Sequence, residues 1–286
     1  MASKPCSYED LSWFLGLLEA EAYFGAWYDT AVKSGPELRV GVSITMAEPK
    51  LMYKIQTMLG FGHARKVHQH KSGRTYFRFE AYSLEDILRL ALLCNGNLVL
   101  EKRKVKFKAW LKNVEKVRKS SRQAFRAVTF LNRKVLPCLS NAWLSGFLEN
   151  DGGFASSKLK FCRLAQGFKI HFDLKFYLSQ THAHAFMIQL KDVFQNPNPI
   201  QPKTNPVVHE RLETTRLEVL KRVMLYLETY PFRGKRKRNI ETFRTLLTFR
   251  TKIGVKPVSK ETKELLVRAI GSLRPLSRDH EVEVEF

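Results

Sequence analysis

Two short segments of this sequence place carboxylates directly after a run of apolar residues. Residues 13–24 read WFLGLLEAEAYF and residues 143–154 read WLSGFLENDGGF, so that Glu21 and Asp151 each end a segment with a helical pattern. A carboxylate at the C-terminal end of a helix faces the negative end of the helix dipole, which costs a few tenths to about 1 kcal/mol. Because this unfavourable arrangement occurs twice, we expect the two acids to share one chemical purpose.

The two segments belong to a longer internal repeat. Aligning Trp13 with Trp143 also superposes Gly16 on Gly146 and Glu19 on Glu149, and it brings Glu21 onto Asp151. Further along, the triplet Lys-Arg-Lys at 102–104 recurs at 235–237, at nearly the same offset. Two matches in the same order and with similar spacing indicate a duplicated unit.

Each half has the same predicted order of elements. In the first half the sequence predicts helices at 7–21, with Ser7 as N-cap and Asp10 at capping-box spacing, and at 49–58 and 84–93, and strands at 38–46, 62–70 and 74–82. In the second half it predicts helices at 140–151, 182–194 and 217–229, and strands at 168–178 and 206–215. The expected order in each half is helix, two strands, helix, two strands, helix. One strand of each pair is inferred from this order and not from its own residue pattern. The fold class is therefore α+β with antiparallel sheets.

The repeat also divides the chain. We expect an N-terminal domain at 1–112, a basic linker at 113–139 and a C-terminal domain at 140–286, which are ordinary domain sizes.

The composition points to a polyanionic partner. Lysine and arginine number 49 against 27 acids, and this excess most often serves nucleic-acid binding, although a basic protein with no such role has the same balance. The four cysteines lack metal-site or disulfide spacing, which favours a reducing compartment. No apolar run approaches the roughly 18 residues of a membrane helix, and MASKPCSYEDLSW does not read as a signal or transit peptide.

The alternating strands suggest how such a partner is bound. Apolar side chains alternate with basic and polar ones, so one face of each sheet packs under helices while the other faces solvent or a ligand. A two-stranded ribbon fits the major groove of B-DNA, although an ordinary solvated face has the same pattern. The candidate DNA-contacting residues are Arg39, Ser43, Thr45, Arg74, Tyr76, Arg78, Lys169, His171, Lys175, Tyr177 and Arg211.

The segments FLGLLEAEA (14–22) and LSGFLENDG (144–152) resemble the nine-residue signature of the LAGLIDADG homing endonucleases. Two copies in one chain are similar to the monomeric, tandem-domain form of that family. The resemblance implies two pseudo-symmetric αββαββα domains, antiparallel sheets that form a DNA-binding saddle, and motif helices packed at the domain interface. It also implies a site-specific endonuclease that makes a staggered double-strand break in a long pseudo-palindromic DNA target.

By the same resemblance, Glu21 and Asp151 are the metal-binding catalytic acids, and the carbonyls of Ala20 and Asn150 are further ligands. Two or three divalent ions near the domain interface are implied. Oxygen donors of this kind suit Mg²⁺, with Mn²⁺ or Ca²⁺ as substitutes. Glu19 and Glu149 match an earlier acid of the signature, and we expect them to tie the helix end to neighbouring backbone.

The family also places basic or polar residues around its metals. The candidates here are Lys50, Gln180, Lys102 and Lys235, whose alternative role is simple phosphate contact or solvation. Ala22 stands where the family usually has glycine, and Glu21 is one methylene longer than Asp151. This asymmetry suggests either unequal cutting of the two DNA strands or a displaced first metal site.

Other functions stay open at this point. Related proteins of this fold act as RNA-binding intron maturases, so intron RNA is a possible partner, and a non-cleaving DNA-binding protein is a third class. The retained acid pair favours cleavage. A zinc site at the histidines is disfavoured because no cysteine or acid completes a ligand set, and no glycine-rich phosphate loop is present. The resemblance implies an intron gene in a mitochondrion or chloroplast.

Overall fold

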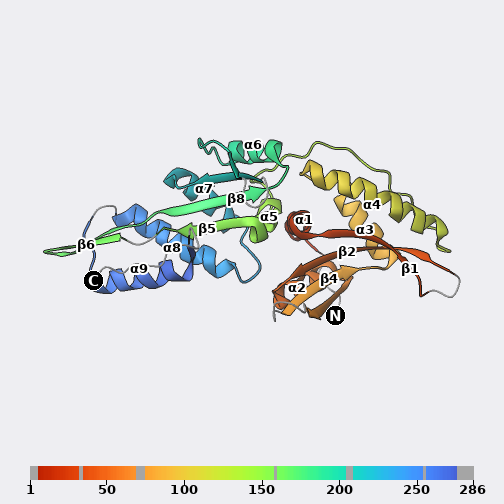
Figure 1. Cartoon of the computed structure of the whole chain (residues 1–286), viewed down its shortest axis with the longest axis horizontal. Helices are drawn as coiled ribbons and strands as arrows, with labels where there is room; N and C mark the ends of the chain where they lie inside the picture. The colour runs from red at the N-terminus through yellow and green to blue at the C-terminus, as the bar shows by residue number, and fades with distance from the viewer. Residues whose placement is uncertain are drawn as a thin grey trace. The chain divides into compact units, whose positions relative to one another are not determined.

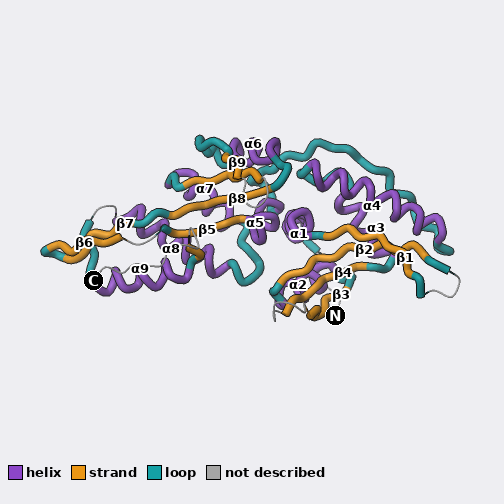
Figure 2. Tube along the Cα trace, viewed as in Figure 1, coloured by secondary structure: helices purple, strands orange, loops and turns teal. Residues whose placement is uncertain are grey.

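The chain folds into two compact units, residues 1–150 and residues 151–286. The structure is a computed structural model and describes residues 6–31, 35–68, 75–157, 160–203, 209–253 and 256–275. Each unit combines helices with mainly antiparallel strands (Figures 1 and 2). The predicted α+β class is therefore confirmed. No helix in these ranges is both long and apolar enough to span a bilayer.

The first unit follows the predicted order closely. Its elements are α1 (Tyr8–Glu21), β1 (Tyr23–Asp29), β2 (Glu37–Met46), α2 (Pro49–Leu59), β3 (His63–His68), β4 (Thr75–Ala81), α3 (Leu84–Cys94), α4 (Glu101–Ser120) and α5 (Trp143–Asp151), whose last residue already belongs to the second unit. The strand β1, which the sequence pattern did not show, pairs with β2, and the sheet order is β1-β2-β4-β3. Residues 71–73, which separate the predicted strands at 62–70 and 74–82, lie outside the described residues.

Helices cover one face of this sheet and build the core of the first unit. Val42 and Ile44 of β2 are buried, and Phe24 of β1 packs edge-on against Phe107 of α4 with ring centroids 5.8 Å apart. Phe14 of α1 meets Phe79 of β4 in the same way at 6.2 Å. The opposite face, which we call the open face, carries the alternate residues of each strand.

The predicted linker begins as a helix and lies against the first unit. Helix α4 runs through the expected boundary at 112 to Ser120. Beyond it, the Asn95 side chain donates to the carbonyl of Thr129 at 2.7 Å and accepts from the Leu131 N–H at 2.8 Å. The domain limits themselves stay a prediction.

The second unit repeats this plan with additions. It contains β5 (Gly152–Ser156), β6 (Lys160–Leu164), β7 (Gly167–His171), β8 (Leu174–Gln180), α6 (His184–Val193), β9 (Gln201–Lys203), β10 (His209–Thr214), α7 (Leu217–Thr229), α8 (Lys237–Ile253), α9 (Lys260–Ser272) and β11 (Arg274–Pro275). The main sheet has the order β11-β5-β8-β10-β9, in which the short β11 runs parallel to β5. The rings of Phe154, Phe176 and Phe243 meet in its core.

The prediction of a single strand at 168–178 is wrong. The structure divides it into β7 and β8 at Asp173, and β7 pairs with β6 in a separate two-stranded sheet. At the break the Asp173 carbonyl accepts from the Ser157 N–H at 2.8 Å, and the Asp173 N–H donates to the Ser157 hydroxyl at 2.7 Å. The alternating pattern continues through the break, because Phe172 and Leu174 are both buried, so periodicity carries no sign of it.

Candidate active site

Helix α1 positions the first acidic segment. Its N-terminus is fixed by the predicted capping box, in which the Asp10 N–H donates to the Ser7 hydroxyl and the Asp10 carboxylate accepts from the Ser7 N–H. Residues 12–19 are all buried, and the helix ends at Glu21, where the Ala22 N–H donates to the Leu18 carbonyl at 2.8 Å. The half-buried Glu21 is thus held at a defined helix end.

Helices α1 and α5 touch backbone to backbone within the first unit. A Cβ built on Gly16 would overlap the Trp143 carbonyl, and one on Gly146 would overlap the Trp13 carbonyl. In addition, the Ala142 N–H donates to the buried Ser12 hydroxyl at 3.2 Å. The small residues of the two segments therefore allow a helix contact that no larger residue permits.

The first acid of each segment holds this helix pair together. The Trp13 indole N–H donates to Glu149 Oε2 at 3.0 Å, and the Trp143 indole N–H donates to Glu19 Oε2 at 3.1 Å. Glu19 also accepts from the backbone N–H groups just ahead of α4, including that of Val99 at 2.8 Å. The prediction that these acids tie the helix end to backbone is confirmed for Glu19 and stays a prediction for Glu149, which also accepts from the indole of the other helix.

Burial governs the ionisation of Glu19. It raises the pKa of this carboxyl to about 7, against the lowering effect of the backbone and indole donors. A group so deeply enclosed is suited to fixing the helices and not to binding a ligand from solvent.

The sequence reasoning missed the residues that neutralise the helix ends. The Arg103 guanidinium donates to the carbonyls of Glu19, Ala20 and Ala22, with 2.8 Å to Ala22. In the second unit, Arg236 donates to the carbonyl of Gly152, which follows Asp151 directly. These are the middle residues of the repeated Lys-Arg-Lys triplets, and their contacts place a positive charge at the negative end of each helix dipole. The repeat itself was the signal that could have found them.

The second acid of each segment has a side-chain amide as partner. In the first unit Asn150 Nδ2 donates to Glu21 Oε1, and in the second unit Gln180 Nε2 donates to Asp151 Oδ2. Glu21, Asn150, Asp151 and Gln180 are all half-buried, so each carboxylate stays accessible to solvent. The division between the units falls between Asn150 and Asp151, so Glu21 belongs to the first unit and Asp151 to the second.

The register of the sheets shows that the two acids have unlike neighbours. Tyr23, two residues after Glu21, pairs with Ser43 on β2, and Gly153, two residues after Asp151, pairs with Tyr177 on β8. Three residues further along these partner strands stand Met46 and Gln180. Met46 therefore occupies in the first unit the place that Gln180 occupies in the second.

The three candidate lysines lie at different kinds of position. Lys50 is exposed in the first turn of α2 and does not extend the strand before it. Lys102 is half-buried in the first turn of α4, and Lys235 is exposed in the turn ahead of α8. Their roles stay predictions.

In the first unit, the candidate DNA-contacting residues lie on the open face of the sheet. Thr45 is opposite Arg78 in the register, and the Arg78 Nε–H donates to the Thr45 hydroxyl at 2.9 Å. Ser43 and Tyr76 are half-buried on the same face, and Arg39 is exposed. Arg74 lies outside the described residues.

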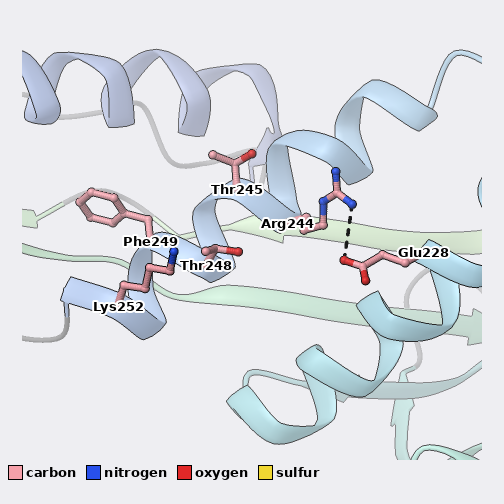
Figure 3. Close-up of a pocket in the computed structure, with 6 residues that line it drawn as sticks. All are labelled: Glu228, Arg244, Thr245, Thr248, Phe249 and Lys252. Carbon is pink, nitrogen blue, oxygen red and sulfur yellow. Dashed lines mark hydrogen bonds and ion pairs between the residues drawn. The ribbon is translucent and has the colours of Figure 1, made fainter.

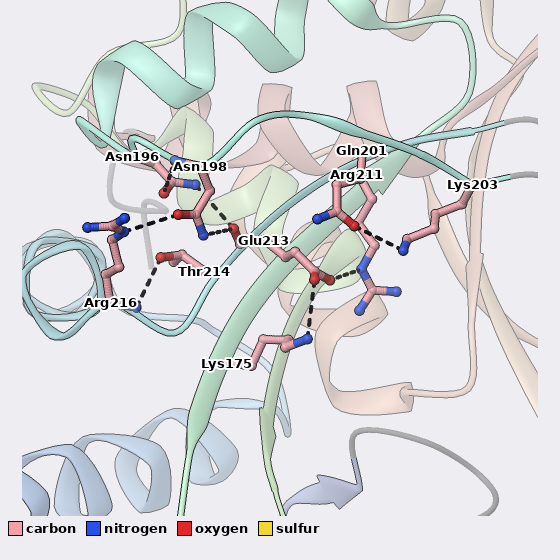
Figure 4. Close-up of polar contacts among 9 residues, drawn as sticks. All are labelled: Lys175, Asn196, Asn198, Gln201, Lys203, Arg211, Glu213, Thr214 and Arg216. Atoms are coloured by element: carbon pink, nitrogen blue, oxygen red, sulfur yellow. Dashed lines mark hydrogen bonds and ion pairs between the residues drawn. The ribbon is translucent and has the colours of Figure 1, made fainter.

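In the second unit, the predicted basic residues converge on an acid that the sequence reasoning did not name. Glu213 forms ion pairs with Lys175 at 3.3 Å and with Arg211 at 2.8 Å (Figure 4). Arg211 also lies over the Tyr177 ring at 4.0 Å. Figure 4 also shows the backbone of Glu213 held in place, since Asn196 and Asn198 donate to its carbonyl. Lys169 and His171 are exposed on β7 and so belong to the separate hairpin, not to this face.

The first unit carries the counterpart of this acid. Glu80 pairs in register with Ser43 as Glu213 pairs with Tyr177, and the two acids are separated by the same offset as the Lys-Arg-Lys triplets. Arg65 and the Tyr82 hydroxyl both donate to Glu80, the latter at 2.9 Å. Burial, which is nearly complete for Glu80 and partial for Glu213, opposes the ionisation of both acids, but their cationic neighbours lower the pKa of each. Each open face is therefore a mixed-charge surface with a fixed central carboxylate.

The hollow in Figure 3 has a different character. It measures about 480 Å³ and lies between α7 and α8, lined by Glu228, Arg244, Thr245, Thr248, Phe249 and Lys252. The acid in its lining, Glu228, is paired with Arg244 at 3.4 Å. We therefore assign no hydrolytic chemistry to it.

The donor chemistry at the helix ends fits a hard cation. Carboxylate and amide oxygens are the ligands that Mg²⁺ and Ca²⁺ accept, and Mg²⁺ commonly takes only one or two carboxylates together with waters and substrate phosphate oxygens. Within the described ranges, no group of three or more histidine, cysteine or acidic side chains is gathered as a metal site.

Comparison with solved structures identifies the fold of the chain. The meganuclease I-SmaMI, solved on uncleavable DNA, matches with a TM-score of 0.69 at 18% sequence identity, covering 94% of this chain and 99% of that one. The LAGLIDADG meganuclease I-AabMI, solved on uncleaved DNA, matches with a TM-score of 0.64 at 17% identity, covering 92% of this chain and 99% of that one. The chain has the LAGLIDADG meganuclease fold. I-SmaMI has also been solved on uncleaved DNA with calcium ions, and that structure matches with a TM-score of 0.66 at 18% identity over 91% of this chain and 97% of that one.

A curated relative is consistent with the LAGLIDADG fold. The probable intron-encoded endonuclease 4 of Neurospora crassa is 24% identical over 228 residues, which cover 78% of this chain and 37% of the relative. The chain thus spans little more than a third of the length of that relative. No family model matches the chain.

Proposed function

We propose that this chain is a site-specific DNA endonuclease that hydrolyses phosphodiesters with the help of divalent metal ions. The observation that carries this proposal is that the two acids of each motif helix differ in their burial and in their partners. Glu19 and Glu149 are buried and bound to tryptophans, whereas Glu21 and Asp151 stand half-buried at the helix ends. The meganuclease fold and the name of the Neurospora relative support it.

In this proposal Glu21 and Asp151 hold the metal ions, with the Asn150 and Ala20 carbonyls as further ligands. A bound Mg²⁺ would lower the pKa of an attacking water and screen the leaving oxygen. The Ala20 carbonyl already accepts from Arg103, so this ligand would share its oxygen with the guanidinium. Asn150 and Gln180 each hydrogen-bond one oxygen of their acid, which orients the carboxylate for a ligand.

The remaining candidates take supporting roles. Lys102, Lys235 and Lys50 would place positive charge near the phosphate that reacts, where a developing charge needs stabilisation. The open faces of the two sheets would bind the DNA on either side of the cleavage site, through Arg39, Arg78, Lys175, Arg211 and their polar neighbours. Two such faces in one chain suit a monomer and a long, roughly pseudo-palindromic target that is cut with a stagger.

The setting is proposed on the same basis. The relative is described as intron-encoded, and we propose an intron gene in an organelle for this chain too. The retained acids favour DNA cleavage over an exclusively RNA-binding, maturase role.

The decisive experiment is cleavage of a library of candidate target sequences by the purified chain with Mg²⁺. We expect Glu21→Gln and Asp151→Asn each to reduce cleavage by more than about 100-fold, because several kcal/mol of charge stabilisation depend on the metal. The exposed Glu264 of α9 gives a matched control, Glu264→Gln, which should cut at the wild-type rate. Full activity of both acid variants would contradict the assignment of the metal ligands. Failure of the wild type to cut any sequence would contradict the function.

A further inference from the structure

Aromatic side chains lie exposed on the open face of the first unit. Tyr23 and Trp27 stand on β1 with 69% and 43% of their surface exposed, and Tyr82 follows β4 directly at 45%. Tyr23 pairs in register with Ser43 and Trp27 with Arg39, so the rings share a face with the candidate DNA-contacting residues. We call Tyr23, Trp27 and Tyr82 the aromatic patch.

The sheet is built to receive these rings. Gly25 and Gly41 stand directly opposite each other on β1 and β2. A Cβ on Gly41 would come within 2.7 Å of the Tyr82 ring and 3.1 Å of Trp27, and one on Gly25 within 2.9 Å of the Tyr23 ring. The rings therefore occupy the space left by two missing side chains and lie close to the backbone.

Contacts within the patch hold the rings in place. Trp27 and Tyr82 meet edge to face, with centroids 5.7 Å apart and planes at 83°. The Tyr82 hydroxyl donates to Glu80 at 2.9 Å. An ordered apolar surface of this kind on an otherwise polar face is typical of a binding site.

The chemistry of the surrounding face indicates the ligand. Arg39, Arg65 and Arg78 lie on the same open face, where Glu37 and Glu80 pair with the first two. A ligand suited to this mixed-charge face combines negative charge with apolar points of contact. The major groove of DNA offers both, because the C5-methyl group of thymine is its apolar feature between flanking phosphates.

The second unit has different chemistry at the matching positions. The register places Ala155 opposite Lys175 where the first unit has Gly25 opposite Gly41. Its open-face tyrosine, Tyr177, lies over Gly153 and is covered by Arg211 on its other side. The two halves of a bound target would therefore be read by different side chains.

We propose that the aromatic patch of Tyr23, Trp27 and Tyr82 recognises the methyl groups of thymines in the half of the DNA target bound by the first unit. This inference rests on the proposed function. Trp27 stands six residues after Glu21, and at about 3.3 Å per residue the patch reaches roughly 20 Å from that acid. The thymines it contacts should lie within about six base pairs of the phosphate at Glu21, at about 3.4 Å per base pair.

The test replaces each thymidine of the cleavable target, one at a time, by deoxyuridine, which lacks only the methyl group. Equilibrium DNA binding is measured without divalent metal, so that the readout does not depend on cleavage. At one or two positions in the half of the target bound by the first unit, we expect the loss of the methyl group to lower the affinity about fourfold. This is the contribution of one buried carbon. Replacing thymidine in the second unit's half should have no such effect.

Variants connect the effect to the patch. Trp27→Ala should abolish the difference between thymidine and deoxyuridine at the sensitive position, while Tyr82→Phe, which keeps the ring, should retain it. Tyr28→Ala is the matched control, because Tyr28 is 65% exposed on the same strand but points to the opposite face. It should leave the full deoxyuridine effect in place.

The outcomes separate the two proposals. A chain that binds one sequence specifically but shows no deoxyuridine-sensitive position contradicts the aromatic-patch inference alone. A chain that binds no DNA specifically contradicts the proposed function and this inference with it. A monomer–dimer equilibrium that Trp27→Ala abolishes would instead identify the patch as a contact between copies of the chain and overturn the inference.

Discussion

At the scale of single residues, Arg103 supplies positive charge at the acidic end of α1. A helix that ends in carboxylates needs positive charge nearby, and Arg103 brings it within hydrogen-bond distance of three carbonyls at the end of α1. Arg236 makes the corresponding contact with Gly152 in the second unit. The charge at these helix ends is therefore supplied by protein side chains, whatever metal binds in addition.

Arg103→Met should lower the free energy of unfolding by roughly 2–3 kcal/mol, because the lost hydrogen bonds are charge-assisted and leave carbonyls without a donor. Urea unfolding measures this directly. Lys106→Met, at an exposed position of the same helix, is the control and should change stability by less than about 0.5 kcal/mol. Equal stability of the two variants would show that the Arg103 contacts do not stabilise the helix end.

Glu213 should give the stability of the chain a pH dependence in the acid range. Its pKa is lower in the folded state than in the unfolded state, because Lys175 and Arg211 outweigh partial burial. A lowered carboxyl pKa contributes stability above the ordinary value of about 4.3, and this contribution is lost as the pH falls through the folded-state pKa. The free energies of unfolding of the wild type and of Glu213→Gln, measured between pH 7 and pH 3, should therefore converge at the acid end. A difference between the two proteins that stays constant with pH would contradict the ion pairs.

At the scale of elements, the contact of α1 with α5 depends on two glycines. Gly16 and Gly146 each face a backbone carbonyl of the other helix, and backbone cannot give way as a flexible side chain does. The tryptophan–glutamate pairs on either side then fix the two helices in register.

Gly16→Ala should destabilise the chain by about 3 kcal/mol or more, because the added methyl separates the helices and strains the pairs that join them. Gly271→Ala supplies the opposite case. Gly271 lies in α9 with open space around it, and alanine there should stabilise by about 0.5–1 kcal/mol. Thermal unfolding of both variants tests these two predictions, and a Gly16→Ala protein as stable as the wild type would disprove the close contact.

At the scale of the whole molecule, the two units repeat one plan with different chemistry. Both have a half-buried second acid, an arginine at the helix end and a carboxylate on the open face, whereas the two buried first acids, Glu19 and Glu149, both lie in the first unit. They differ beside the second acid, where the first unit has Met46 and the second has Gln180, and on the open face, where the aromatic patch occurs in the first unit.

This difference predicts unequal cutting of the two DNA strands. Gln180 hydrogen-bonds Asp151 from the neighbouring strand, whereas the equivalent place in the first unit holds Met46 and the amide on Glu21 comes from Asn150. We therefore expect a nicked intermediate to accumulate during cleavage of a supercoiled target. Met46→Gln should shorten its lifetime, and Gln180→Met should lengthen it. Linear product that appears without any nicked intermediate would contradict the assignment.

The sequence by itself determined the repeat and the order of most elements, and it singled out the matched acids of the two motif segments as candidates. Each of these is written in local patterns: the capping box at Ser7, the alternation of β2 and the matched acids of the two motif segments. Through the resemblance of the motif segments to the family signature, it also predicted that Glu19 ties the helix end to neighbouring backbone.

Only the tertiary structure decided which residues meet. The break at Asp173 depends on hydrogen bonds to Ser157, sixteen residues away, and burial continues across it, so periodicity could not reveal it. In the sequence, Arg103 is one residue of a lysine-rich run and Glu213 is one residue of a polar strand. Only the fold brings the carbonyls that bind Arg103 and the Lys175 that binds Glu213 close to them. The place of Met46, equivalent to that of Gln180, follows from strand register, which is set by pairing between segments distant in sequence and not by either segment alone.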